Sequence, residues 1–327
     1  MAYKCDGESG CGGFGDRIRG VASVFLVAIA MDRPFRLIWH RKSRFEDYFN
    51  VEKSFLDETD NGNDHYRIEF MNIEKEKELF DFNSNLSLIK PQGQNLEIKT
   101  NSIAGIQGLL ENPAFVRDKI PKWFPGFNVE QDRAELVAAV LKFIVGRPNE
   151  KLMELYNTCV ASHFVGKNLK IGVQIRNGDH GEIRVKAENY DCFAEKIVKD
   201  FPSQTNNREK MLIFVTGDSN DKFQNLVDQL RRNHFHVVTS SDVCGQLTVS
   251  HIDYFYGNDT WLSDAKSYLD WFALTQMDRL YISRSGYGET ASMISLVPTQ
   301  RFIHWSATCD FQPYSMDIRE RFFFRTI

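Results

Sequence analysis

Short apolar segments alternate with helical segments in the C-terminal half of this chain, from residue 167 onward. Near-continuous apolar strands separated by helices are typical of a parallel sheet covered by helices on both faces. We therefore expect an α/β fold here. The predicted strands are 169–176, 211–216, 234–240, 279–283 and 301–305, and the predicted helices are 187–201, 221–230, 261–277 and 289–296.

The N-terminal part begins with a glycine-rich stretch, "GESGCGGFGDRIRGV" at 7–21. Apolar residues then recur at helical spacing from Ile18 to Ile29, and Asp16 is placed to cap that helix. The apolar segment 35–39 follows as a buried strand. The chain is thus expected to open with a loop, a helix and a strand.

The middle of the chain contains two more predicted helices, one from 132 that is stopped by Gly146 and Pro148 and one at 149–164, and a surface helix at 72–80. The rest of 41–99 is polar and mixed and predicts no clear element. A chain of 327 residues with 42% hydrophobic content favours two domains of ordinary size. We place the boundary just before the regular alternation of apolar strands and helices begins, which gives domains 1–165 and 166–327.

The composition excludes several classes. A net charge of −4 argues against a nucleic-acid surface. The six cysteines form no C-x-x-C pair, which excludes a zinc ribbon. We expect most of them to be buried free thiols, with a Cys5–Cys11 bridge across the glycine turn as the alternative.

The apolar segment 21–31 is too short to span a membrane, which takes about 20 residues. It resembles a signal peptide, but the segment before it is long and glycine-rich and carries Asp6, Glu8 and Asp16, which argues against that interpretation. We expect no membrane span within this chain. If an anchor lies upstream, the protein belongs in the Golgi or secretory lumen, and otherwise in the cytoplasm.

Polar or glycine-bearing turns follow three of the predicted strands. In an open parallel sheet, ligands bind beyond the carboxyl ends of the strands, so these turns should converge on one site. The candidate residues are Gln174, Arg176, Asn177, Asp179, His180 and Glu182 after the first strand, Thr216 and Asp218 after the second, and Ser283, Ser285, Gly286, Tyr287 and Gly288 after the fourth.

The turn 283–289 runs into a helix, whose free N–H groups and dipole would bind a diphosphate. Arg176, leaving a buried strand, can donate a bidentate pair of hydrogen bonds to the same phosphates. The alternatives are an ion pair of Arg176 with Asp179 or Asp218, a tight turn without a ligand, and N-capping of a helix by Asp218.

Two motifs are absent from the sequence. No D-x-D occurs, so a sugar-nucleotide enzyme would neutralise its diphosphate with arginine and helix ends rather than with a metal. No G-x-x-x-x-G-K-[ST] occurs, which excludes a Walker-type nucleoside triphosphatase. We therefore expect no metal requirement.

The glycine-rich stretch permits a dinucleotide interpretation. Gly10, Gly12 and Gly15 fit G-x-G-x-x-G ahead of a helix and a strand. The acidic residue expected after that strand is replaced by "WHRKSR", which would favour the 2′-phosphate of NADP. An NADP-dependent oxidoreductase is therefore one candidate.

A second interpretation joins the two halves. "CGGFGDRIRGVASVFLVAIAMDRPFRLIW", then "IGVQIRNGD", "FVTGDS" and "DWFALTQMDRLYISRSGYGETASMIS", resembles the fucosyltransferase superfamily. That group includes the α1,6-fucosyltransferases of nodulation and N-glycan cores, the xyloglucan fucosyltransferases of plants and the protein O-fucosyltransferases. The resemblance covers both ends of the chain but not the segment from about 41 to 136.

The resemblance implies a GT-B fold, in which two Rossmann-like domains face a cleft. It also implies an inverting, metal-independent transfer of L-fucose from GDP-fucose, held by the second domain, to a glycan acceptor held by the first. Arg176 corresponds to the family's arginine on the β-phosphate, and Asp218 to an acidic residue near the nucleoside. Ser283, Ser285, Tyr287 and Gly288 correspond to a phosphate-binding turn.

Two departures from the family leave the linkage open. Gln174 stands where many members carry histidine, and Asn177 stands where the α1,6 enzymes carry a second arginine. In the glycine-rich stretch, we expect Gly13 and Gly15 to let backbone approach the donor, with Arg17 serving an anion or Asp16. The alternative is a glycine turn that only lets the helix pack tightly.

The expected mechanism breaks the C1–O bond of GDP-fucose through an oxocarbenium-like state. Arg176 and the Ser285–Gly288 amides would stabilise the departing diphosphate. Asp16, Asp179, His180 and Glu182 are the candidate bases for the acceptor's proton, and a carboxylate is favoured. A non-catalytic glycan-binding module is the third candidate.

Overall fold

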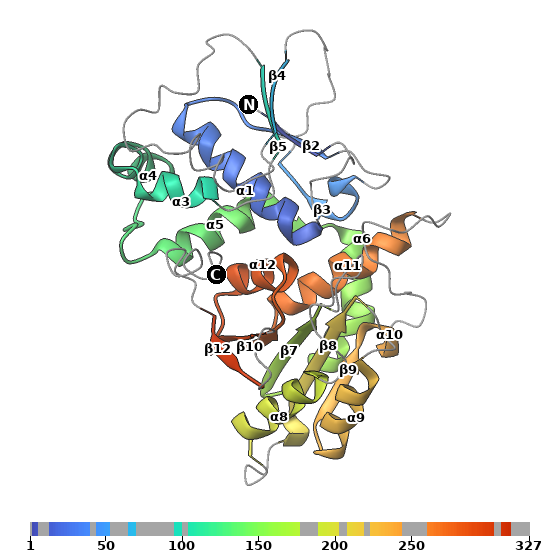
Figure 1. Cartoon of the computed structure of the whole chain (residues 1–327). Helices are drawn as coiled ribbons and strands as arrows, with labels where there is room; N and C mark the ends of the chain where they lie inside the picture. The colour runs from blue at the N-terminus through green and yellow to red at the C-terminus, as the bar shows by residue number, and fades with distance from the viewer. Residues whose placement is uncertain are drawn as a thin grey trace. The chain divides into compact units, whose positions relative to one another are not determined.

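The computed structural model forms two compact units (Figure 1). It describes residues 2–5, 13–39, 44–52, 65–69, 95–99, 104–176, 189–202, 208–218, 223–243, 260–303 and 309–314. The first unit runs to Arg147 and the second begins at Pro148, earlier than the boundary predicted near residue 165. The predicted helix at 72–80 lies outside the described residues.

The second unit is built on a six-stranded sheet in the order β12-β11-β10-β7-β8-β9. All neighbouring strands are parallel except β12, which runs antiparallel to β11 at the edge. The α/β expectation is confirmed, but β12 was not predicted. The strands are β7 Leu169–Ile175, β8 Met211–Gly217, β9 His236–Thr239, β10 Arg279–Ile282, β11 Thr299–Phe302 and β12 Phe311–Pro313.

Helices cover both faces of this sheet. Alternate residues of β7, such as Ile171 and Val173, belong to one apolar core with residues of α8 (Tyr190–Asp200) and α9 (Gln224–Arg232). The intervening Gly172 backs the other face, where an added Cβ would lie 2.9 Å from the side chains of Leu274 and Met277. The helices on that face are α11 (Thr260–Thr275) and α12 (Gly286–Ser295).

The strand order reverses at β7. The chain moves from β7 through β8 to β9 in one direction and resumes at β10 and β11 on the other side of β7. The crossover helices therefore lie on opposite faces, since parallel crossovers are right-handed. A reversal of this kind opens a crevice at the carboxyl ends of the two central strands, where ligands of α/β folds bind.

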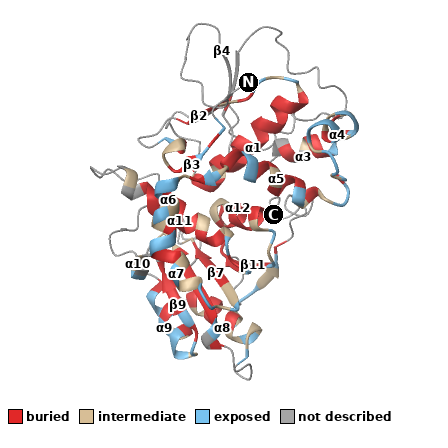
Figure 2. Cartoon of the chain, turned by 180° about the vertical axis from the view of Figure 1, so that it is seen from behind, coloured by how far each residue is buried: buried red, intermediate tan, exposed pale blue. Residues whose placement is uncertain are grey.

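The first unit has a parallel sheet in the order β2-β1-β5-β4. Helix α1 (Phe14–Ala30) connects β1 to β2 and packs against α3 and α5. Every residue of α1 except Asp16 is buried, as Figure 2 shows. The strands are β1 Ala2–Cys5, β2 Arg36–Trp39, β4 His65–Glu69 and β5 Asn95–Lys99, with short strands β3 Phe49–Asn50 and β6 Arg147–Pro148.

The start of α1 corrects one prediction. The helix begins at Phe14 with Gly13 as its N-cap, so Asp16 lies in the first turn and does not cap it. A carboxylate in the first turn still interacts favourably with the helix dipole. Among the described helices of the chain, none has the length and hydropathy that crossing a bilayer requires.

Helix α5 (Arg133–Val145) ends where the sequence predicted. Gly146 follows it with φ of 67°, and a Cβ there would overlap the carbonyl oxygen of Asn50. The predicted helix 149–164 is α6 (Glu150–Tyr156), which continues through a π-helical turn into α7. The remaining elements are α3 Ala104–Glu111, a π-helical turn Phe115–Lys119, α4 Ile120–Trp123, α7 Ser162–Phe164, α10 Ser240–Val243 and 3₁₀ turns at Phe45–Asp47 and Arg208–Lys210.

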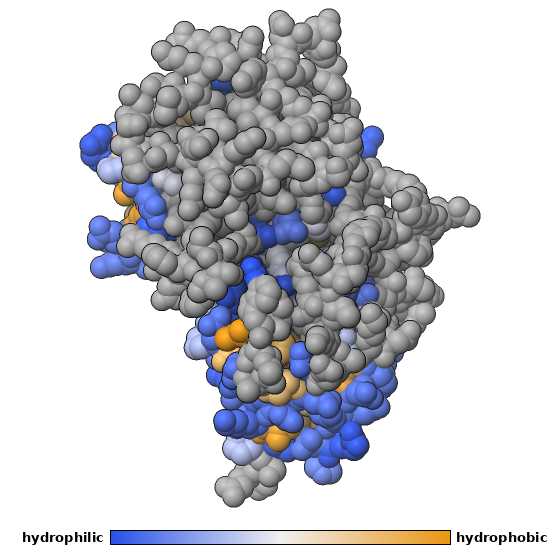
Figure 3. Space-filling model, in the orientation of Figure 1, coloured by the Kyte–Doolittle hydropathy of each residue, from blue (hydrophilic) through white to orange (hydrophobic). Residues whose placement is uncertain are grey.

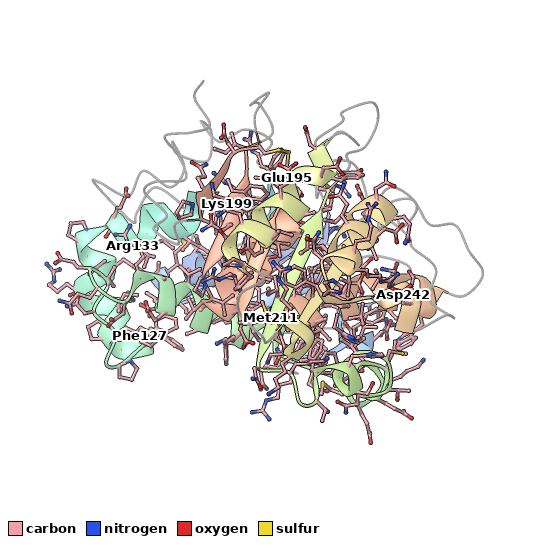
Figure 4. The ribbon with its side chains drawn as sticks, turned by 90° about the horizontal axis from the view of Figure 1, so that it is seen from below. Phe127, Arg133, Glu195, Lys199, Met211 and Asp242 are labelled. Carbon is pink, nitrogen blue, oxygen red and sulfur yellow. A yellow bond between two sulfur atoms is a disulfide. The ribbon has the colours of Figure 1, made fainter. Side chains whose placement is uncertain are left out.

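The surface of the second unit is mainly hydrophilic where Figure 3 draws its described residues. Helix α8 of this unit has one exposed polar face and one buried apolar face. Glu195 and Lys199, labelled in Figure 4, lie four residues apart on the exposed side, while Phe193 and Ile197 are buried in the core. This spacing is the reason that α8 could be predicted from periodicity.

A disulfide joins Cys192 of α8 to Cys309, and Cys159 is also disulfide-bonded. Within the described ranges no cysteine is a free thiol, so the expectation of mostly free thiols is wrong. The proposed Cys5–Cys11 bridge involves Cys11, which lies outside the described residues. Cysteines 117 positions apart give no sequence signal of pairing.

The Cys192–Cys309 bond closes a long loop and should therefore stabilise the fold. We expect Cys192→Ser to lower the free energy of unfolding by about 2–5 kcal/mol, measured by urea denaturation without reductant. Cys192→Ser/Cys309→Ser is the control, because removing the second thiol should cost little more. Equal stability of the wild type and both variants would contradict the bond.

Candidate functional site

Three strand ends meet at the carboxyl edge of the sheet of the second unit. Gln174 of β7 lies opposite Thr216 of β8 on one side and Ile282 of β10 on the other. The residues that follow these strands, Arg176, Asp218 and Ser283, are therefore neighbours. The structure thus brings together the described candidates from all three predicted turns, and it does so at the reversal of strand order.

Helix α12 begins at this edge, earlier than predicted. Ser285 is its N-cap, and its Oγ accepts the N–H of Gly288 at 3.2 Å. Gly286, Tyr287 and Gly288 therefore form the first turn, whereas the sequence predicted a helix from 289. The amides of a first turn point out of the helix N-terminus, where they attract an anion.

A small hydrogen-bond network ties the end of β7 to this helix start. The N–H of Arg176 donates to Ser283 Oγ at 2.7 Å. The hydroxyls of Ser283 and Ser285 donate to Gln174 Oε1 at 3.3 and 3.0 Å. The N–H of Ser283 donates to the carbonyl oxygen of Gln174 at 2.9 Å. Gln174 therefore connects the end of β7 to both serines of the turn before α12.

Arg176 pairs with Asp218, with 3.3 Å between Nη1 and Oδ2. The two side chains are 15% and 10% exposed, so the pair is largely buried. The ion pair named as the alternative for Arg176 is therefore present. A guanidinium carries five N–H donors, so one ion pair does not exclude an anion at the same group.

Asp218 does not have the capping role that was its alternative, and its charge acts on a nearby tyrosine. It does not cap α9, which begins at Gln224 with Phe223 as its N-cap. Burial and the charge of Asp218 raise the pKa of Tyr190 to about 12, so this phenol stays protonated at neutral pH.

A buried polar cluster behind the edge was missed by the sequence reasoning. Thr216 Oγ1 donates to Asp270 Oδ2 at 2.6 Å, and Lys266 forms an ion pair with the same oxygen. Both charged side chains are 3% exposed. Within the described residues, Asp270 Oδ1 accepts no hydrogen bond. The one available signal was a charged pair four residues apart on an otherwise apolar face of α11.

Tyr287 connects this cluster to α12. Its hydroxyl donates to the carbonyl oxygen of Ser267 on α11. Burial and the charge of Asp270 raise the pKa of Tyr287 well above its usual value. The phenol is therefore neutral and fixes the first turn of α12 against α11.

The candidates of the glycine-rich stretch lie in the first unit. Asp16 forms an ion pair with Arg19, three residues on. Arg17 is 2% exposed, and its guanidinium lies 5.5 Å from the ring centre of Trp39. This cation–π contact offers a structural reason for a buried arginine in the first turn. Gly13 and Gly15 supply the N-cap and the buried start of α1.

Four candidates, Asn177, Asp179, His180 and Glu182, lie outside the described residues. Of the four candidate bases, the structure therefore describes Asp16 alone. In the part of the chain that it describes, no three His, Cys, Asp or Glu side chains gather to hold a metal ion.

Comparison with known proteins finds similar structures but no similar sequence. No protein-family model and no curated protein sequence matches the chain. A mutant of Arabidopsis thaliana FUT1 in complex with GDP superposes with a TM-score of 0.62 at 17% identity, covering 94% of this chain and 71% of that one. The chain has the fold of the fucosyltransferases.

Two more solved structures share this fold. NodZ α-1,6-fucosyltransferase soaked with GDP-fucose has a TM-score of 0.57 at 14% identity, covering 96% of this chain and 98% of that one. POFUT1 in complex with GDP has a TM-score of 0.51 at 11% identity, covering 92% and 98%. The expected GT-B fold is confirmed. The cleft between its two domains stays a prediction.

Proposed function

We propose that this protein is a glycosyltransferase that moves L-fucose from GDP-fucose to a hydroxyl group of a glycan acceptor. The observation that carries the proposal is the geometry at the strand reversal. There the guanidinium of Arg176 follows β7, and the N-terminus of α12 follows β10, its neighbour in the sheet. Both groups attract anions, and a nucleoside diphosphate is a ligand whose two phosphates they could bind together.

The fold supports GDP as the nucleotide. The Arabidopsis and POFUT1 structures were solved with GDP, and the NodZ structure was soaked with GDP-fucose. We assign the donor to the second unit and the acceptor to the first. The residues 148–165, which the sequence placed with the acceptor domain, then belong to the donor unit.

The proposed reaction is an inverting displacement at C1 of fucose. The bond between C1 and the β-phosphate oxygen breaks, and its electron pair leaves with GDP. The acceptor oxygen bonds to C1 on the opposite face, and its proton passes to a basic side chain of the protein, for which a carboxylate is favoured. Asp16 is a candidate for this base, together with Asp179, His180 and Glu182.

Arg176 and the first turn of α12 stabilise the charge that develops on the departing diphosphate. Asp218 holds the guanidinium of Arg176 in place through their ion pair. The sequence contains no D-x-D, so we propose that these groups take the place of a divalent metal.

Calorimetric titration with GDP, UDP and NADPH tests this proposal. We expect GDP to bind, with an affinity unchanged by EDTA, and GDP-fucose to release GDP when an acceptor glycan is added. Tight binding of NADPH without GDP binding would instead identify an oxidoreductase. GDP binding without turnover on a panel of fucose acceptors would identify a non-catalytic module.

A further inference from the structure

Gln174 lies at the centre of the edge, yet it is only 3% exposed. Its Oε1 accepts two hydrogen bonds, from Ser283 Oγ and from Ser285 Oγ. These serines belong to the turn between β10 and α12, which would hold the diphosphate. One atom of β7 therefore fixes two residues of the neighbouring turn.

The direction of these hydrogen bonds is determined by the backbone. Ser283 Oγ accepts the N–H of Arg176, and Ser285 Oγ accepts the N–H of Gly288. Each hydroxyl then has its own hydrogen left to donate, and a carbonyl-type oxygen is the partner that it needs. This requirement orients the amide of Gln174 with its oxygen toward the serines.

The lack of a side chain at Gly288 leaves room for the same oxygen of Gln174. An added Cβ at this position would lie 2.7 Å from Gln174 Oε1 and 3.1 Å from Ile282 Cβ. The amide and the glycine thus occupy one closely packed space between β7 and α12. A side chain at 288 would push the amide away from the serines.

We infer that Gln174 is a positioning residue of the diphosphate site. Its Oε1 holds Ser283 and Ser285 so that the backbone of Arg176 and the first turn of α12 stay in register. This inference rests on the proposed function. It differs from the donor contact predicted for Gln174, because the oxygen is engaged by the turn and the side chain is buried.

The test is a double-mutant cycle on GDP affinity, measured by calorimetry. Gln174→Met keeps the length of the side chain but removes the acceptor, and we expect it to raise the Kd for GDP on the order of 10-fold. Ser285→Ala should have a similar effect. If Gln174 acts through Ser285, the double variant should lose little more than the larger single loss.

Gln224→Met is the matched control, since Gln224 lies exposed on α9 and hydrogen-bonds Asp228. Its GDP affinity should equal that of the wild type. Urea denaturation confirms that each variant is folded. If Gln174→Met fails to fold, Gln174→Asn serves in its place, because its shorter amide cannot reach both serines.

The outcomes separate the two proposals. A wild type that does not bind GDP overturns the proposed function. A wild type that binds GDP, with Gln174→Met binding equally well, overturns the inference alone. Fully additive losses in the double variant also overturn it, because they would show that Gln174 acts independently of Ser285.

Discussion

Arg176→Ala will lower the rate of fucose transfer on the order of 100- to 1,000-fold, the loss typical of removing one donor from a developing oxyanion. Arg176 follows β7, and its backbone N–H donates to Ser283 in the turn before α12, so we expect its guanidinium to reach the same phosphates as the helix amides. The turnover number should fall more than the affinity for the acceptor changes, because the lost interaction strengthens as the diphosphate departs. Steady-state release of GDP from GDP-fucose measures this effect.

The variant also leaves the carboxylate of Asp218 without the guanidinium of Arg176, and that charge could repel the diphosphate. Arg176→Ala/Asp218→Asn removes both charges and separates the two causes. We expect the double variant to stay slow, because the donor is still missing. Arg279→Ala, at the opposite end of β10 beside Phe201, should keep wild-type turnover. Near-normal turnover in Arg176→Ala would contradict the mechanism.

Asp270→Ala will lower the free energy of unfolding by about 3–5 kcal/mol, the cost typical of breaking a buried ion pair. The substitution leaves the ammonium group of Lys266 buried and removes the acceptor of the Thr216 hydroxyl. Urea denaturation at neutral pH measures the loss. An effect within 0.5 kcal/mol, as is typical of a surface substitution, would contradict the buried pair.

The control for this prediction replaces both charges. Lys266→Met/Asp270→Leu fills the same space with apolar side chains, and such replacements of buried pairs are often neutral or stabilising. We expect the double variant to be more stable than Asp270→Ala. A double variant at least as unstable as the single one would show that the pair contributes through packing or through Thr216 rather than through charge.

Much of the fold could be predicted because its elements follow simple periodicities. The strands 169–175 and 211–217 are mostly apolar, which is typical of central parallel strands covered on both faces. Helix α8 has one apolar face, and helix α5 is followed by Gly146, a residue that commonly ends a helix. The rule that ligands bind at carboxyl ends then predicted that the turns after β7, β8 and β10 lie at one edge of the sheet, and the described residues of these turns do lie there.

The remaining features depend on contacts between distant residues. The pairing of Cys192 with Cys309 has no local pattern, and β12 is a short edge strand of mixed polarity. The buried pair of Lys266 and Asp270 looks like an ordinary solvent-exposed pair until α11 is placed against β8. The sequence predicted Gln174 as a donor contact, and no local pattern indicated the serines that engage its oxygen, because they lie more than 100 residues away.

A crystal structure of the protein in complex with GDP tests the central claim most directly. We predict that the β-phosphate lies within hydrogen-bond distance of the guanidinium of Arg176 and of the amides in the first turn of α12. A diphosphate bound at Gly13 of α1, with Arg176 contacting Asp218 and no phosphate, would contradict the account.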